Sequence, residues 1–147
     1  GQSSSGKAKC EILRKVCFAD LCGVSLSVVN LYASQSEDSG SDFGELLKSM
    51  ESEFLVHVNE ESRYIEGLHP IRSKHVVERL HEFLPIDNTV ISVMKMADKA
   101  DLPILFSHLP EFTLNKETFF CDAVESLWDE KDLSNYTSAI QGLFQGM

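Results

Sequence analysis

The chain has 147 residues, of which 43% are apolar and 24% are charged, a composition typical of a globular protein and unlike that of a disordered chain. Its net charge of -10 argues against a protein whose main partner is nucleic acid or an anionic membrane. No run approaches the ~20 apolar residues needed to cross a bilayer, and no signal peptide is visible.

The four cysteines, at positions 10, 17, 22 and 121, show no C-x-x-C spacing and lie in apolar helical contexts. We interpret them as reduced thiols that behave as small buried hydrophobes. Together with the absence of a signal peptide, they predict a cytoplasmic protein.

Residues 1–8 are rich in Ser and Gly and lack a starting Met, so we expect a flexible leader or a cloning remnant. They also match the beginning of the phosphate-binding loop G-x-x-x-x-G-K-[ST]. Ala8 stands where that loop needs a hydroxyl, however, and no strand precedes it. Because the chain also ends directly after an apolar helix pattern, we expect a fragment of a longer protein.

Three amphipathic helices are predicted over residues 9–21, 25–33 and 42–52, because apolar side chains recur at three- and four-residue spacing. Gly23 is expected to end the first helix, and Ser41 or Asp42 to cap the third. The residues expected to be buried are Leu13, Val16, Cys17, Leu21, Val28, Val29, Tyr32, Phe43, Leu46, Leu47 and Met50.

A β-hairpin is predicted next, since residues 54–58 and 63–68 flank the polar turn 59–62. A fourth helix follows from Pro70 to Phe83, before Pro85 stops it. Its expected buried residues are Val76, Val77, Leu80 and Leu84. Three helices, a hairpin and a further helix predict a winged-helix domain over residues 9–84.

Residues 85–147 are predicted to be helical throughout, with helices over 88–100, 101–109, 118–130 and 133–144. The last two are joined by a few residues and are expected to pair antiparallel. The predicted fold class is therefore mainly α with a small β-hairpin, a winged helix followed by an antiparallel helical array.

Winged helices often bind DNA through the third helix, which enters the major groove. Here that helix and its flanks are acidic, with a single lysine: Asp42, Glu45, Lys48, Glu51 and Glu53. The loop before it, residues 34–41, is also longer than the turn of about three or four residues in a DNA-reading module. DNA binding is therefore disfavoured, because affinity for DNA depends on neutralising phosphates.

The junction between the second hairpin strand and the fourth helix is the candidate functional site. His69 stands at the N-terminal edge of that helix, and Pro70 suits the first helical turn. Unpaired backbone N–H groups and the helix dipole favour an anion there, and phosphate is the obvious candidate. The alternative is that His69 only caps the helix or lies at the edge of the core.

No metal site or catalytic centre is predicted. His69, His75 and His81 recur every six residues, but six residues turn a helix through about 600°, so His75 and His81 lie on different faces. Ser73 and Ser107 lie near histidines, yet nothing supplies a strained elbow or an oxyanion hole. We expect this segment alone to catalyse nothing.

The segment Glu66-Gly67-Leu68-His69-Pro70-Ile71-Arg72-Ser73, placed after a hairpin and before an amphipathic helix, resembles the winged-helix domain of the NLR-like signal-transduction ATPases with numerous domains (STAND). The similarity is greatest to bacterial members that act in antiphage defence. It covers about residues 10–110 and is strongest over residues 50–82.

This resemblance implies a regulatory segment of an oligomerising ATPase that binds ATP or ADP with Mg²⁺ in its nucleotide-binding domain. That domain of the same parent chain would be the partner, with no role for DNA or a membrane, and the isolated segment would bind no cofactor. In the family, a histidine of a Met-His-Asp-like motif contacts the β-phosphate of ADP in the resting state. His69 of Leu68-His69-Pro70 occupies that position, although Pro70 replaces the aspartate.

We add Arg72, in the first helical turn, as a second phosphate contact; its alternative role is a surface salt bridge. Residues 85–147 would then begin an α-helical sensor arm. The alternatives that remain are a winged helix used only for protein–protein contact and, third, a DNA-binding regulator.

Overall fold

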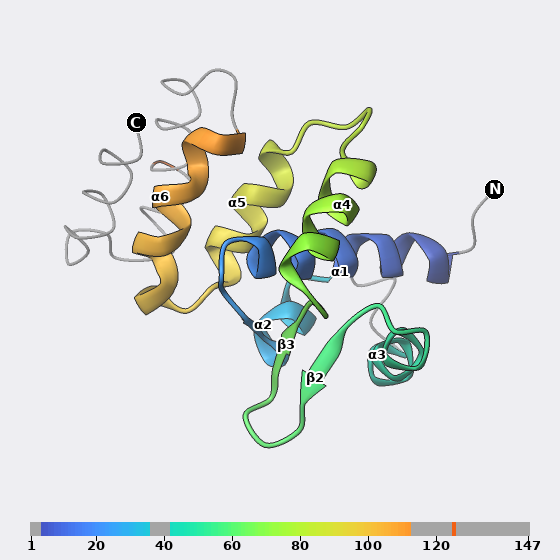
Figure 1. Ribbon diagram of the computed structural model, residues 1–147. Helices are drawn as coiled ribbons and strands as arrows, with labels where there is room; N and C mark the ends of the chain where they lie inside the picture. The colour runs from blue at the N-terminus through green and yellow to red at the C-terminus, as the bar shows by residue number, and fades with distance from the viewer. Residues whose placement is uncertain (1–3, 36–41, 113–124, 126–147) are drawn as a thin grey trace.

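The computed structural model describes residues 4–35, 42–112 and 125, and it is mainly helical with a small three-stranded antiparallel sheet (Figure 1). The elements are α1 (Ser4–Leu21), β1 (Leu26–Ser27), α2 (Val28–Ala33), α3 (Phe43–Ser52), β2 (His57–Asn59), β3 (Tyr64–Glu66), α4 (Pro70–Leu80), α5 (Asp87–Met96), η2 (Lys99–Asp101) and α6 (Leu102–Phe112). The predicted fold class is confirmed, and the order of elements is compatible with a winged helix. Both helices predicted beyond residue 112 fall, apart from the helical residue 125, outside the described residues.

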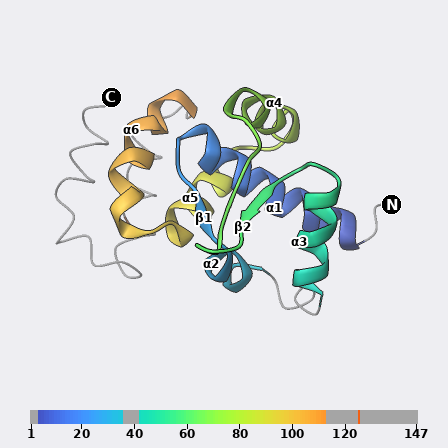
Figure 2. The same ribbon diagram turned by 60° about the horizontal axis from the view of Figure 1, so that its bottom comes forward.

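Helix α1 is the centre of the fold (Figures 1 and 2). It makes its most extensive contacts with α4, which crosses it, and packs also against α5 and β3. Its start corrects a prediction, because residues 4–8 are helical and not a flexible leader. Ala8 is buried and precedes the buried residues Ile12 and Val16 at four-residue spacing, so the apolar face of α1 extends over the added turn.

The sheet has the strand order β1-β3-β2, and both outer strands pair antiparallel with β3. The hairpin of β2 and β3 is confirmed, whereas β1 was expected to be the start of a helix over 25–33. Ile65 pairs with Val58 on one side and with Leu26 on the other, and Leu26 and Ile65 are fully buried. A two-residue strand shows no periodicity, so only this long-range pairing defines it.

The short strand also changes which face of α2 is buried. The fully buried residue is Leu31, whereas Val29, which was expected to face the core, is 69% exposed, and Tyr32 is exposed as well. Ser27 caps this helix, and its hydroxyl accepts the Asn30 N–H at 3.4 Å. The helix begins at Val28, three residues later than expected.

Asp42 is the N-cap residue of α3, one of the two positions predicted, although its side chain makes no capping hydrogen bond. Two other predicted helix ends were wrong. Helix α4 ends at Leu80, so Leu84 is 63% exposed rather than buried. Helix α6 continues through Pro110, because its last residue, Phe112, packs edge-to-face on Phe18 with ring centroids 5.1 Å apart. Such aromatic contacts help to offset the hydrogen bond that proline removes from a helix.

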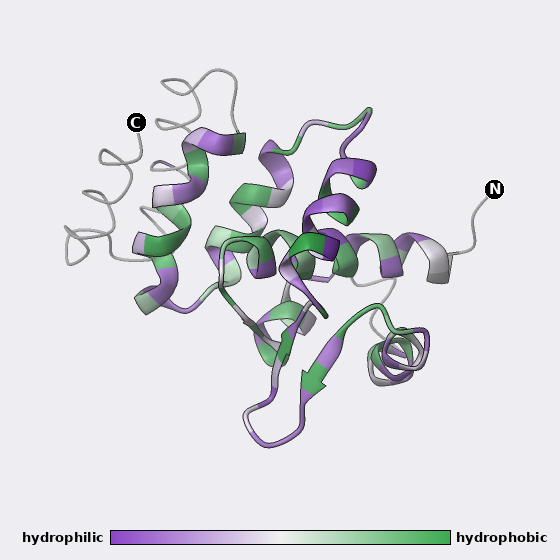
Figure 3. Ribbon diagram, in the orientation of Figure 1, coloured by the Kyte–Doolittle hydropathy of each residue, from purple (hydrophilic) through white to green (hydrophobic). Residues whose placement is uncertain are grey.

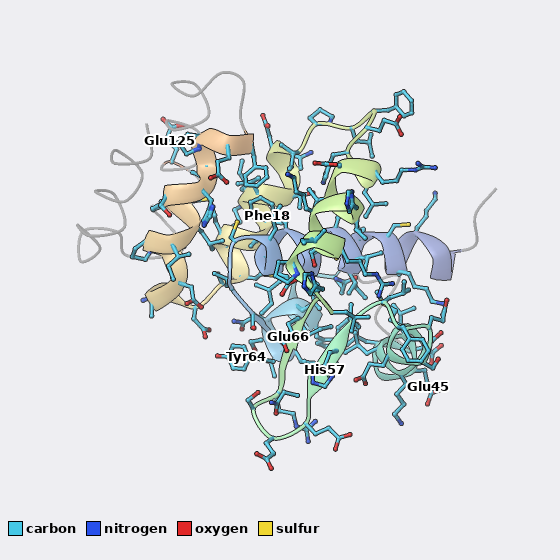
Figure 4. All side chains as sticks on the ribbon, in the orientation of Figure 1. Phe18, Glu45, His57, Tyr64, Glu66 and Glu125 are labelled. Atoms are coloured by element: carbon cyan, nitrogen blue, oxygen red, sulfur yellow. The ribbon has the colours of Figure 1, made fainter. Side chains whose placement is uncertain are left out.

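Apolar side chains from all the larger elements meet around α1. Figure 3 shows hydrophobic (green) and hydrophilic (purple) residues alternating along these helices. Figure 4 shows Phe18 at this centre. None of the helices in the described ranges is both long enough and apolar enough to span a membrane.

A buried polar contact fixes the start of α4 on the end of α1. The Ser73 side chain is only 1% exposed, and its hydroxyl donates a 2.6 Å hydrogen bond to Oδ2 of Asp20. Gly67, at the end of β3, leaves room for this pair. A Cβ atom at position 67 would lie 2.7 Å from Asp20 Oδ2 and still closer to Ser73 Oγ, which real structures do not tolerate.

We therefore predict that Gly67→Ala lowers the free energy of unfolding by about 1 to 3 kcal/mol, the usual cost of overpacking. Gly44→Ala is the matched control, because a Cβ at that exposed helical position meets nothing within 4 Å. It should be neutral or stabilising by up to about 1 kcal/mol. Urea titrations of the three proteins measure the difference, and equal stability of the two variants would contradict this account.

A chain of hydrogen bonds joins α1, the end of α4 and α5. Arg14 Nη1 donates to the buried Thr89 hydroxyl at 2.7 Å, and that oxygen lies 3.0 Å from His81 Nε2. His81 Nδ1 donates to the Leu84 carbonyl at 3.3 Å, which leaves Nε2 of the neutral ring to accept from Thr89. Burial lowers the pKa of His81 from 6.5, with a contribution from the Arg14 charge.

Lowering of this pKa predicts a loss of stability in mild acid. The unfolded chain binds the His81 proton more tightly than the folded chain does. The contribution of neutral His81 to the free energy of unfolding is therefore complete above about pH 6.5 and is lost as the pH falls through the folded-state pKa. The His81→Gln variant should show a smaller loss of unfolding free energy between pH 7.5 and 5.5 than the parent. His75→Gln, an exposed change on α4, should retain the parental loss. Identical pH profiles for both variants would contradict the assignment.

Candidate functional site

His69 is the N-cap residue of α4. Its backbone is extended, with φ -161° and ψ 138°, as expected for the residue that links a strand to a helix. The ring Nδ1 accepts the Ile71 N–H at 3.1 Å, and the residue is exposed. The described residues provide no hydrogen-bond partner for Nε2. His69 therefore caps the helix, which was the alternative interpretation. It also presents one ring nitrogen outward, as an anion-binding role requires.

The first turn of α4 offers fewer free amides than the sequence suggested. Pro70 has no N–H, the Ile71 N–H is bound by the His69 ring, and the Ser73 N–H donates to the His69 carbonyl at 2.9 Å. The Arg72 N–H is the only one of the first-turn amides without a partner in the described structure. An anion at this position would therefore meet the His69 ring, one amide and the Arg72 side chain.

An open groove runs along α4 beside α1, with a volume of about 1030 Å³, and we call it the α4 groove. Its lining residues are Leu13, His69, Ile71, Arg72, His75, Val76, Glu78, Arg79, Leu80 and Glu82. The two residues singled out in the sequence thus share one groove. His75 and Arg79 were missed, although the spacing of residues 72, 75 and 79 places them on one face of a helix.

The polar lining of the α4 groove is mixed, and the formal charges of its arginines and glutamates balance. Two arginines and two histidines stand against Glu78 and Glu82. His75 Nδ1 lies 4.0 Å from Glu78 Oε2, an exposed pair that contributes little to stability. The acids lie toward the C-terminal end of α4, so the end with His69 and Arg72 is the one suited to an anion.

The described residues contain no group of three His, Cys, Asp or Glu side chains that could hold a metal ion. Cys17 and Cys22 are buried, and burial raises the pKa of Cys17 to about 11 and that of Cys22 to about 12. Both thiols therefore stay protonated at neutral pH and do not act as nucleophiles. Cys121 lies outside the described residues.

The surface of α3, which a DNA-binding winged helix would insert into the major groove, exposes Asp42, Glu45 and Glu53 beside Lys48. Glu53 also accepts a 2.6 Å hydrogen bond from Lys9, which lowers its pKa. Figure 4 shows Glu45 on the outer side of α3. This face supplies no concentration of cations for a phosphate backbone.

Comparison of the chain with protein-family models, with curated proteins and with solved structures finds no match.

The capping bond separates two roles of His69 that substitution can test. His69→Ala removes the cap and should lower the free energy of unfolding by about 0.5 to 2 kcal/mol. His69→Ser keeps a capping oxygen and should stay within a few tenths of the parent, about the scatter among good caps. Denaturant titration of both variants provides the comparison, and equal loss in both would contradict a capping role.

Proposed function

We propose that the chain is the non-catalytic regulatory winged-helix segment of an NLR-like STAND ATPase in immune or antiphage signalling. In this proposal, His69 binds the β-phosphate of ADP and stabilises the resting state. The observation that carries it is the exposed His69 ring at the start of α4, whose Nδ1 is occupied by the Ile71 amide while Nε2 points to no partner in the described chain.

The capping bond determines which nitrogen can serve a ligand. Because Nδ1 accepts a hydrogen bond, the proton of the neutral ring resides on Nε2, which is then a donor. A phosphate oxygen is an acceptor that matches it. Arg72, in the same groove, adds a permanent positive charge and a fork of donors suited to phosphate.

Neighbouring apolar side chains suit a contact with a second domain. Ile71 is 64% exposed beside His69 and Arg72 in the α4 groove, and Leu68 is also exposed. A domain that carries ADP on its surface would cover these side chains as it brings the phosphate to His69. Burial of an exposed isoleucine contributes about 1.5 to 3 kcal/mol to such a contact.

The phosphate contact is weak enough to be released and strong enough to favour the closed state. A hydrogen bond to a charged group contributes about 1.5 to 3 kcal/mol. If it forms only in the closed, ADP-bound state, it favours that state by about 10- to 150-fold. Pro70 stands where the family has an aspartate, so we propose Arg72 as the second residue that contacts the phosphate.

The remaining parts of the proposal follow from the parent class. ATP or ADP with Mg²⁺ would be held by a nucleotide-binding domain of the parent chain, which would oligomerise on activation in the cytoplasm. Residues 85–147 would begin the sensor arm. The sequence encoded upstream of Gly1 is expected to contain a strand, a complete G-x-x-x-x-G-K-[ST] motif and a Walker B acid.

A second candidate is a winged helix that only binds another protein. It is favoured by two exposed apolar residues that follow α4, Phe83 and Leu84. The two candidates differ in whether His69 affects nucleotide retention.

We predict that His69→Ser in the full-length parent protein raises ligand-free activity and lowers ADP retention by about 10- to 150-fold. The serine keeps the helix cap, so the effect reports on the ring. Lys74→Gln, an exposed change on α4 outside the α4 groove, is the matched control. Nucleotide content after purification and basal ATPase rate are the measurements, and parental values of both in His69→Ser would contradict the latch.

A further inference from the structure

A second pocket lies on the other side of α1, between α1, α2 and α5. Residues two apart on a helix are separated by about 200°, so Lys15 faces away from Leu13, which lines the α4 groove. The pocket has a volume of about 640 Å³, within the range of small-molecule sites. Lys15 is the residue of α1 that lines it in the described part of the chain.

Lys15 is buried without a counter-charge of its own. Only 5% of the residue is exposed, and lysines are almost never buried unless they are paired. Within the described part of the chain, its ammonium forms no ion pair and no hydrogen bond. Glu11, the acid one helical turn before it, forms its ion pair with Arg14 at 3.3 Å. The charged form of Lys15 is therefore poorly compensated in the folded protein.

This environment favours the neutral amine of Lys15. Burial lowers its pKa, Glu11 raises it by a smaller amount, and the neighbouring Arg14 charge lowers it again. A larger fraction of the side chain therefore carries a free electron pair near neutral pH than in an ordinary lysine. Desolvated lysines of this kind are nucleophiles toward carbonyl compounds.

The Lys15 amine is open to the pocket and is not sealed in the core. Among the described residues that are not exposed, Gln35 Oε1 is the only side-chain nitrogen or oxygen that is both closed off from solvent and without a hydrogen-bond partner. Lys15 Nζ also has no such partner there, so it belongs to the small part of the residue that solvent reaches. Because Lys15 lines the pocket, a small molecule inside it meets this nitrogen.

Other polar side chains of the pocket are already engaged. Asn30 Nδ2 on α2 donates a 2.9 Å hydrogen bond to the Met96 carbonyl at the end of α5, which joins two walls of the pocket. The Ser34 hydroxyl donates to a carbonyl of α2 at 2.7 Å. Lys95 and Lys99 each have an interaction of their own. Lys15 is thus the reactive group that these walls leave available.

We propose that Lys15 is a covalent attachment site for a small aldehyde, which it binds in the pocket between α1, α2 and α5 as a Schiff base. The Nζ electron pair attacks the carbonyl carbon, and a carbon–nitrogen double bond replaces the carbon–oxygen double bond. The carbonyl oxygen leaves as water with the two protons of the amine. The reaction needs no oxidant or reductant, and water reverses it. This site is independent of His69 and of the nucleotide proposed above.

Reductive trapping of the chain with propanal and sodium cyanoborohydride at pH 7.5 tests this site. The reductant converts the Schiff base into a stable secondary amine, and peptide mass spectrometry then measures the rate of labelling at each lysine. We expect Lys15 to be labelled at least about tenfold faster than Lys48, an exposed lysine on α3. Labelling of Lys15 at or below the rate of Lys48 would overturn the proposal.

Two variants locate the reaction. Lys15→Met keeps the apolar stem and removes the amine, so the fast label should disappear while Lys48 is labelled at the parental rate. Ala33→Leu enlarges an exposed side chain at the pocket wall and should slow the labelling of Lys15 alone. Fast labelling that Ala33→Leu leaves unchanged would place the reaction outside the pocket and overturn the site. If Lys15→Met fails to fold, the Ala33→Leu variant decides between these results.

Discussion

The hydrogen bond between Asp20 and Ser73 is the constraint on which the position of the candidate site depends. A buried hydroxyl left without a partner costs about 1 to 3 kcal/mol, so this pair sets where α4 begins on α1. His69 accepts the Ser73 N–H through its carbonyl and is therefore carried to the same place. Gly67 permits β3 to end close to both side chains. The exposed ring is thus held by a contact inside the core.

Sequence periodicity was sufficient for the elements that bury one continuous face. Helix α3, with Phe43, Leu47 and Met50 inward, and the hairpin of β2 and β3 could be predicted for this reason. It was insufficient where a distant contact decides the structure. Strand β1 exists because Leu26 pairs with Ile65, and α6 continues past Pro110 because Phe112 reaches Phe18. Neither partner can be identified from local spacing.

The same distinction holds for the sites. The place of His69 was predictable because Pro70 marks the first turn of a helix, and its sharing of a groove with Arg72 follows from their separation of three residues. The capping bond to Ile71, which consumes an amide expected to be free, depends on a side-chain rotamer that sequence does not specify. The pocket between α1, α2 and α5 could not be predicted, since Lys15 and Lys95 line it together only because α1 packs against α5.

The central claim is that His69 Nε2 contacts a phosphate brought by a neighbouring domain. The most direct measurement is an experimental structure of the parent protein with ADP bound. The account predicts His69 Nε2 at about 2.7 to 3.2 Å from an oxygen of the β-phosphate, with Nδ1 still accepting the Ile71 N–H. A β-phosphate held elsewhere, with the His69 ring open to solvent, would contradict it.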